Sequence, residues 1–187
     1  MTAGLPSIRR ARTEDVPALN ALIALSASHL SEGYYSEAER QALIEDVFGV
    51  DTQLIQDGTY FVVERNGEAV ACGGWSARRT LFGGDQHKEG VDDRLDPERE
   101  PARIRAFFVH PAAARQGLAR RLLDHCEAEA LRAGFSRTEL MATLPGVPFY
   151  QARGYLPVED VTHLLPRGMG VRFVRMGRAI SGCTGSG

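Results

Sequence analysis

A strand pattern that runs into a long amphipathic helix through a turn of small residues constrains this chain most. The run ARIRAFFV (102–109) predicts a strand, and three alanines and Arg115-Gln116-Gly117 separate it from the helix. Apolar residues within one arc of roughly 140°, at about 100° per residue, indicate the helix, and Gly134 marks its end. We therefore expect a fold of mixed strands and helices with this helix as its main crossover. The apolar residues are Leu118, Leu122, Leu123, Cys126 and Ala130.

Length and charge narrow the class of protein. A chain of 187 residues has the length of one domain and can bury a sizeable core. Its apolar content of 43% and charged content of 25% are ordinary for a soluble globular protein. The net charge of -2 gives no overall attraction to nucleic acid or to an anionic membrane. We expect one domain over residues 1–180, a flexible tail over 181–187, and no nucleic-acid or membrane partner.

The cysteines and the hydropathy indicate the compartment. Cys72, Cys126 and Cys183 are odd in number and have no C-x-x-C spacing. This pattern favours a reducing environment over a disulfide framework or a zinc site. No apolar run approaches the roughly 18 residues of a membrane span, and no signal peptide is evident. We expect a cytoplasmic protein that uses no metal.

Local signals along the chain give the order of the elements. Ser36 and Glu39 have the spacing of a capping box at a helix start. Asn66-Gly67 between two β-rich runs predicts a tight type I′ hairpin. Residues 79–101 lack periodicity and form a long loop, which in compact domains is often functional. The order is α+β with about seven strands. Strands are expected at 5–12, in the hairpin 59–77, and at 102–109, 137–143, 155–165 and 168–180, with helices at 14–30, 37–48, 118–133 and 147–153.

The turn before the long helix has the features of an anion site. The first turn of a helix leaves backbone N–H groups unpaired at the positive end of the helix dipole, where phosphate binds well. Gly117 would let an anion approach the backbone, and Arg120 and Arg121 add positive charge one turn later. A plain strand-to-helix turn with solvated arginines explains the same residues. Neither a G-x-x-x-x-G-K-[ST] loop nor a complete dinucleotide fingerprint occurs.

Two segments together resemble the GCN5-related N-acetyltransferases (GNAT), a family that transfers acetyl from acetyl-coenzyme A (acetyl-CoA) to an amine. FFVHPAAARQGLARRLL (107–123) resembles the family's R/Q-x-x-G-x-G/A loop. Gly117 and Ala119 match its last two fixed positions, and Ala114 replaces the usual Arg or Gln. FYQARGY (149–155) resembles the second motif, in which the preceding Asn and Ala positions are altered.

The resemblance covers residues 104–155 and implies the fold, the cosubstrate and the site. The fold would be a three-layer, GNAT-like α+β domain, with a mixed, mostly antiparallel sheet of about seven strands and helices on both faces. The pyrophosphate of acetyl-CoA would lie on the Arg115–Ala119 loop, and its pantetheine arm along the preceding strand. Tyr150 would act as general acid toward the leaving thiolate, and the Phe107 amide would donate to the acetyl oxygen. The implied coenzyme-binding positions are Phe107, Val109, Arg115, Gln116, Gly117, Leu118, Ala119 and Arg120.

The implied reaction is direct transfer of acetyl from acetyl-CoA to a primary amine in a ternary complex. No covalent nucleophile is evident, because G-x-S-x-G is absent and Cys72 is explained as a small core residue. Some family members carry a glutamate as general base four residues ahead of the first pantetheine contact, and here that position is Arg103. A non-catalytic coenzyme A-binding sensor or interaction module with the same fold is the alternative. The candidates for the base are Glu139, Glu159, Asp160 and His163, or a chain of water molecules.

No motif identifies the acceptor amine. An excess of acidic side chains in residues 85–100 would form a negative rim that attracts a cationic amine, and an ordinary solvated loop has the same composition. Trp75 and Tyr34-Tyr35 could line an acceptor cleft, and core packing explains them equally well. A small amine, an aminoglycoside-like compound, an amino acid and a protein amine all stay open, with a small molecule expected rather than a protein. A homodimer is compatible with the resemblance. The acidic residues are Asp85, Glu89, Asp92, Asp93, Asp96, Glu98 and Glu100, against Lys88, Arg94 and Arg99.

Overall fold

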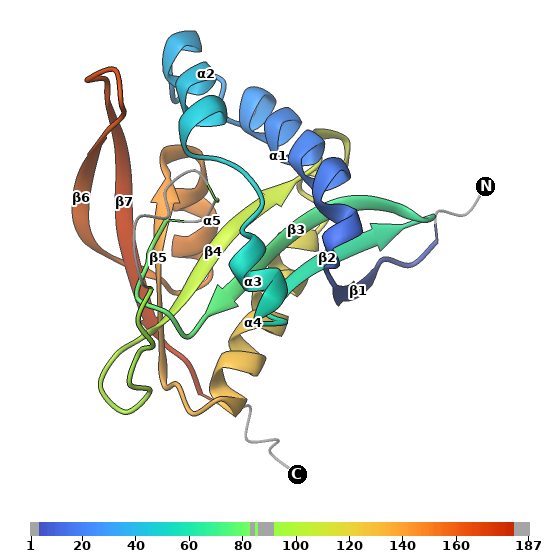
Figure 1. The fold of residues 1–187 in the computed structure, drawn as a ribbon, viewed down its shortest axis with the longest axis vertical. Coiled ribbons are helices and arrows are strands. Elements are labelled where there is room, and N and C mark those ends of the chain that lie inside the picture. Colours follow the sequence, from blue (N-terminus) through green and yellow to red (C-terminus); the bar gives the residue numbers. More distant parts are fainter. Residues whose placement is uncertain (1–3, 83–84, 86–91, 182–187) are drawn as a thin grey trace.

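The computed structural model describes residues 4–82, 85 and 92–181 of the chain. At its centre a seven-stranded sheet has the order β1-β2-β3-β4-β5-β7-β6 (Figure 1). Among the described strands, β4 and β5 alone pair in parallel. The predicted fold class is confirmed, while residues 182–187 of the expected tail lie outside the described residues. The strands are β1 (Ser7–Arg10), β2 (Tyr60–Arg65), β3 (Glu68–Ser76), β4 (Ala102–Val109), β5 (Arg137–Thr143), β6 (Leu156–Leu164) and β7 (Gly170–Ala179). The α-helices are α1 (Val16–Leu30), α2 (Glu37–Asp46), α3 (Thr52–Gln56), α4 (Leu118–Arg132) and α5 (Val147–Ala152).

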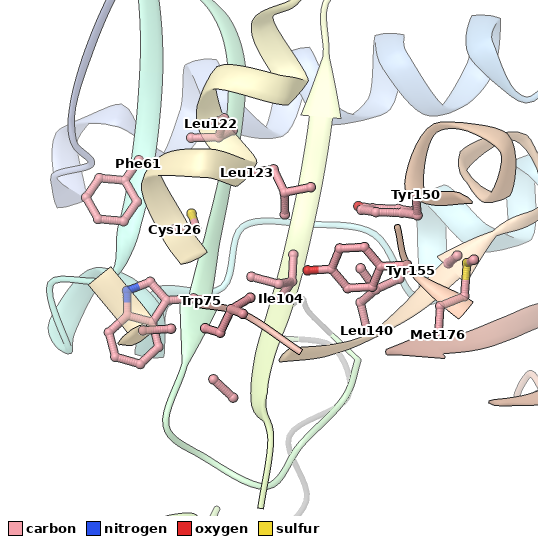
Figure 2. Close-up of a cluster of buried hydrophobic side chains, with 14 of the residues drawn as sticks. Phe61, Trp75, Ile104, Leu122, Leu123, Cys126, Leu140, Tyr150, Tyr155 and Met176 are labelled. Atoms are coloured by element: carbon pink, nitrogen blue, oxygen red, sulfur yellow. The ribbon is translucent and has the colours of Figure 1, made fainter. Parts of the chain in front are cut away.

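The helices cover both faces of the sheet (Figure 1). Alternate residues of β2 show the division, since Phe61 belongs to the core beneath α4 and Val62 to the core beneath α1 and α3. Figure 2 shows Leu123 of α4 next to Ile104 of β4. The predicted apolar arc of α4 is buried as a whole: Leu118, Leu122, Leu123, Cys126 and Ala130. None of the helices in the described part of the chain is long and apolar enough to cross a membrane.

Two of the local sequence signals are confirmed at the level of single hydrogen bonds. In the capping box of α2 the Glu39 N–H donates to Ser36 Oγ at 3.2 Å, and the Ser36 N–H donates to the Glu39 carboxylate at 2.7 Å. Asn66 and Gly67 connect β2 to β3 with φ angles of 54° and 81°, as a type I′ turn requires. Both signals depend only on residues close together in the sequence.

Helices α1 and α3 differ from the sequence expectation. α1 begins at Val16 rather than at residue 14, because Thr13–Asp15 forms a 3-10 turn. The Asp15 carboxylate accepts hydrogen bonds from the Arg12 N–H and the Arg9 guanidinium, each at 2.7 Å, and so ties this turn to β1. The sequence did not indicate α3, because five residues are too few to show a helical period.

Candidate active site

Strands β4 and β5 separate from each other partway along the sheet. They pair over three residues of β4, Ala102 to Ile104. Beyond that point β4 continues along β3 as far as Val109, while β5 continues along β7 as far as Thr143. The sheet therefore opens between the C-terminal halves of two neighbouring strands (Figure 1).

A bulge in β4 shapes one edge of this opening. At Gly73 of β3 the register of the two strands shifts, and Ala106 of β4 has a φ of 53°. The Tyr60 hydroxyl donates to the Ala106 carbonyl at 3.0 Å and holds the bulge in place. The Phe107 ring lies directly over Gly73, since a Cβ on this glycine would meet the ring at 2.4 Å. Bulges recur beside active sites because they redirect the side chains that follow.

The turn into α4 places the start of this helix beside open space. Gly117 precedes the first residue of α4 with a φ of 78°, and Arg115 has a φ of 63°. Apart from Gly117 and its two chain neighbours, no atom of the described residues lies within 4 Å of the position that a Cβ on Gly117 would occupy. His110 has a structural role, because its Nδ1 accepts the Ala112 N–H at 3.1 Å and closes the preceding 3-10 turn. The unpaired N–H groups at the start of this 15-residue helix can therefore receive an anion.

A cavity of about 670 Å³ fills the opening and reaches both faces of the sheet. Two neighbouring residues of β5 show this, because Leu140 belongs to the core beneath α4, Met141 to the core beside α2, and both line the cavity. The volume falls within the roughly 300–1,000 Å³ of ligand pockets. Seven of the predicted coenzyme positions line the cavity: Phe107, Val109, Arg115, Gly117, Leu118, Ala119 and Arg120.

Gln116 is the predicted position that does not line the cavity. Its side chain accepts a hydrogen bond from Arg65 Nη1 at 2.6 Å and so lies against the β2–β3 side of the turn. Of the two arginines that follow, Arg121 donates to the Pro6 carbonyl at 3.1 Å, whereas Arg120 lines the cavity. Arg120 is therefore the better placed of the two to meet a negatively charged ligand.

Tyr150 lies in the cavity wall, 9% exposed, with its ring edge-on to Tyr155 at a centroid distance of 5.5 Å (Figure 2). Burial raises the pKa of the Tyr150 hydroxyl, so this group is protonated at neutral pH. The Tyr155 hydroxyl donates to Glu127 at 2.7 Å and lies 2.8 Å from Thr138 Oγ1. Within the described residues the Tyr150 hydroxyl has no such partner. It therefore holds a proton that no described protein group accepts.

The described wall of the cavity contains no Asp, Glu or His, so none of the predicted general bases lies in it. Glu139 accepts a hydrogen bond from Arg103 and lies 3.6 Å from Arg175 Nη1, so its carboxylate belongs to an ion-pair cluster across β4, β5 and β7. The His163 ring packs against Phe82 at 4.6 Å, behind the wall. The candidates outside the wall are Glu139, Glu159, Asp160 and His163.

Of the aromatic residues suggested for an acceptor cleft, only Tyr34 lines the cavity. The Tyr35 hydroxyl donates to the Arg172 carbonyl at 2.6 Å and accepts the Leu144 N–H at 2.9 Å, and burial raises the pKa of Tyr35 to about 12. Trp75 is buried in the core beneath α4. Core packing is therefore the correct explanation for Tyr35 and Trp75.

Three of the described acidic residues of the 79–101 segment bind groups of the protein: Asp92 and Glu100 within the segment, and Asp85 on Thr52 of α3. None of them lines the cavity. Asp92 accepts the Thr80 N–H at 2.9 Å, and Glu100 pairs with Arg79 at 2.6 Å. The described acidic residues thus give the cavity wall no negative charge, and the rim stays a prediction because Glu89 lies outside the described residues.

Sequence reasoning missed the apolar residues on the α1 side of the cavity. The wall there includes Phe48, Phe82, Phe108 and Phe173. They come from the segment after α2, the segment after β3, and strands β4 and β7, so no single stretch of sequence could have indicated them. In the described ranges, no group of three or more His, Cys, Asp or Glu side chains is arranged to hold a metal ion.

Solved structures of known proteins share this architecture. A GCN5-related N-acetyltransferase of Rhodopseudomonas palustris is 19% identical, with 96% of this chain and 99% of that chain covered and a TM-score of 0.71. The yncA protein of Salmonella typhimurium, solved with its cofactor acetyl-CoA, is 18% identical over 95% of each chain with a TM-score of 0.62. The PaiA N-acetyltransferase of Thermoplasma acidophilum, solved in complex with coenzyme A, is 11% identical over 95% of this chain and 100% of that chain, with a TM-score of 0.63.

These structural similarities show the fold, whereas a comparison of the sequence with family models shows the family. No curated protein sequence matches this chain significantly. The family model described as the Acetyltransferase (GNAT) family matches residues 22–155, which is well over half of the 187 residues. The resemblance in the turn before α4 and in α5 is thereby confirmed at the level of the family. The chain belongs to the GNAT family of acetyltransferases.

Proposed function

We propose that this acetyltransferase moves the acetyl group of acetyl-CoA directly to a primary amine in a ternary complex. The observation that carries the proposal is a single cavity that reaches both faces of the sheet and passes Tyr150 between the Gly117 turn and the α1 side. Direct transfer needs both substrates in place at once, and approach from opposite faces brings their reacting atoms together without a covalent enzyme intermediate.

The Gly117 turn is the proposed site of the coenzyme pyrophosphate. It offers the unpaired N–H groups at the start of α4, a positive φ at Gly117 with no neighbouring atom in the way, and the side chains of Arg115 and Arg120 in the cavity wall. Backbone amides and arginines at a helix start are a suitable set of donors for phosphate oxygens. The pantetheine arm would then run along Phe107 and Val109 of β4 toward Tyr150.

The proposed chemistry uses two groups of this chain. The acceptor nitrogen attacks the thioester carbon with its lone pair, and the Phe107 N–H donates to the carbonyl oxygen as negative charge develops there. One preorganised donor of this kind is worth on the order of 10²-fold in rate. As the carbon–sulfur bond breaks, the Tyr150 hydroxyl gives its proton to the departing sulfur, and the tyrosinate regains a proton that the acceptor nitrogen releases through water. Burial raises the pKa of Tyr150 in the absence of substrates, so its hydroxyl carries a proton at neutral pH before the reaction begins.

The test compares two neighbouring tyrosines. Tyr150→Phe should lower turnover by roughly 10²-fold, the scale of losing one general acid, with coenzyme A affinity within a few-fold of wild type. Tyr155→Phe, the matched control, removes a hydroxyl that binds Thr138 and Glu127 away from the cavity. It should lower the free energy of unfolding by about 1–3 kcal/mol while leaving turnover of the folded protein intact.

Thiol release from acetyl-CoA and urea unfolding measure these two effects separately. Wild-type turnover in Tyr150→Phe, with chemistry rate-limiting, would remove Tyr150 from the mechanism. A wild-type protein that binds coenzyme A but acetylates none of a broad panel of amines would instead favour the coenzyme A sensor.

A further inference from the structure

The α1 side of the cavity has a continuous apolar wall. We call it the acceptor lobe and define it by Val47, Phe48, Phe82, Met141 and Phe173. All five belong to the core cluster beside α2. Phe82 and Phe173 pack edge to face with ring centroids 5.3 Å apart. The lobe thus offers aromatic edges and faces that suit a hydrocarbon or ring of comparable size.

Charged side chains on the described cavity wall are all arginines. Arg115 and Arg120 belong to the Gly117 turn, on the coenzyme side. Arg105 lies nearer the acceptor lobe, and its fully buried guanidinium pairs with the equally buried carboxylate of Asp51 and lies 3.5 Å from Asp92. The described wall contains no carboxylate, so nothing in it balances a positive charge on an acceptor.

We propose that the acceptor is a primary amine with an apolar body, about the size of an aromatic ring or a six-carbon chain, and without a second charge. This inference rests on the proposed function and narrows its acceptor class. Polyamines and aminoglycosides would have to bury a second ammonium here, and a cation–π contact of about 2 kcal/mol does not offset the cost of desolvating that ammonium without a counter-charge. Apolar bodies gain about fourfold in affinity for each buried methylene.

The same wall explains how the acceptor obtains a lone pair without a carboxylate base beside it. An ammonium loses its hydration in an apolar lobe, which lowers its pKa and favours the neutral amine. Among the described residues, the titratable or charged groups around the lobe are Arg105 from β4 with its partners Asp51 and Asp92, Tyr34 after α1, and His163 of β6 behind Phe82 and Phe173. Both carboxylates face Arg105 and neither lines the cavity, so this described set offers the ammonium no direct counter-charge.

Phe82 is the lobe residue that we infer to set acceptor specificity. It is partly buried, whereas Phe173 is 2% exposed, so a change at Phe82 disturbs the core less. The segment that carries Phe82 is anchored by Arg78, whose Nε donates to Asp57 at 2.7 Å. A carboxylate at position 82 would provide the counter-charge that the described wall lacks.

The experiment compares hexylamine with 1,6-diaminohexane, two acceptors that differ by one terminal ammonium. The kcat/KM for acetylation of hexylamine should exceed that of the diamine by at least about 30-fold. Phe82→Glu should reduce this ratio about tenfold or more, whereas Leu164→Glu, on the exposed outer strand and outside the cavity, should leave it unchanged. A diamine used as well as hexylamine, or a ratio unaffected by Phe82→Glu, overturns the inference.

Calorimetric titration with acetyl-CoA, with no amine present, separates this inference from the proposed function. Failure to bind acetyl-CoA refutes the proposed function. Tight binding of acetyl-CoA together with preferred acetylation of the diamine refutes the acceptor inference alone. If the acetyl-CoA complex acetylates neither amine, titration of that complex with each amine tests whether the lobe prefers an apolar amine. Tighter binding of hexylamine than of the diamine supports the apolar acceptor class, and absence of hexylamine binding overturns it.

Discussion

Replacing Gly117 separates the role of this glycine in binding from its role in folding. Gly117→Val forces a β-branched residue into a φ of 78°, a conformation that costs about 1–2 kcal/mol for a residue with a side chain. The new Cβ itself adds no clash with another part of the described chain, because nothing beyond the two adjacent residues lies within 4 Å of it. Gly168, in the β6–β7 turn, has a φ of 77° and equally open surroundings. Gly168→Val should therefore lower the free energy of unfolding by a similar amount.

Coenzyme binding should respond very differently in the two variants. The valine at position 117 would occupy the space in front of the N–H groups of α4, where we place the pyrophosphate. Loss of one charge-assisted hydrogen bond costs about 1.5–3 kcal/mol, so the Kd for coenzyme A should rise about 10- to 100-fold. Gly168→Val should keep the wild-type Kd. Urea unfolding measures the strain, and calorimetry measures the Kd. A folded Gly117→Val protein that binds coenzyme A within twofold of wild type would show that this turn is not the phosphate site.

Two further changes test the elements that shape the cavity. In Gly73→Ala the new Cβ would meet the Phe107 ring at 2.4 Å, so we expect about 1–3 kcal/mol less stability by urea unfolding and a reduced kcat from displacement of the Phe107 amide. Asp57→Asn should lower the free energy of unfolding by about 1–3 kcal/mol at pH 7, because Arg78 holds the pKa of Asp57 below its usual value. A carboxylate whose pKa is lower in the folded state stabilises the protein at any pH above its unfolded-state pKa of about 4. That stabilisation is lost as the pH falls through the folded-state pKa. The difference between wild type and Asp57→Asn should thus vanish in acid, and a difference independent of pH would contradict the ion pair.

The sequence determined those parts of the fold that depend on near neighbours. The apolar arc of α4, the Ser36 capping box and the Asn66-Gly67 turn each lie within one helix or turn, and each is present as expected. The start of α1 was misplaced because the side chain that ties Asp15 belongs to Arg9 on β1. That contact crosses between two elements, and periodicity holds no information about it.

The candidate site shows the same limit more sharply. The Gly117 turn could be read as an anion site because strand, glycine and helix are contiguous. Glu139 stayed a candidate base because its partners, Arg103 and Arg175, reach it only through the registers of β4 and β7 with β5. The sequence could not predict the acceptor lobe, because Phe82 and Phe173 lie far apart in the chain and meet only in the folded core.

The opening between β4 and β5 also has a cost that the chain offsets with side chains. Strands that separate leave backbone N–H groups without a ladder partner, which is unfavourable in a buried place. Ser26 Oγ of α1 accepts the Val109 N–H at 3.3 Å, and the Tyr35 hydroxyl accepts the Leu144 N–H at 2.9 Å. Ser26 lies in α1 and Tyr35 in the turn between α1 and α2, on the side of the sheet where we place the acceptor. The N-terminal segment that lines this side of the cavity therefore also satisfies backbone groups that the opening leaves without a ladder partner, so we expect changes in this segment to affect both the cavity wall and the edges of the opening.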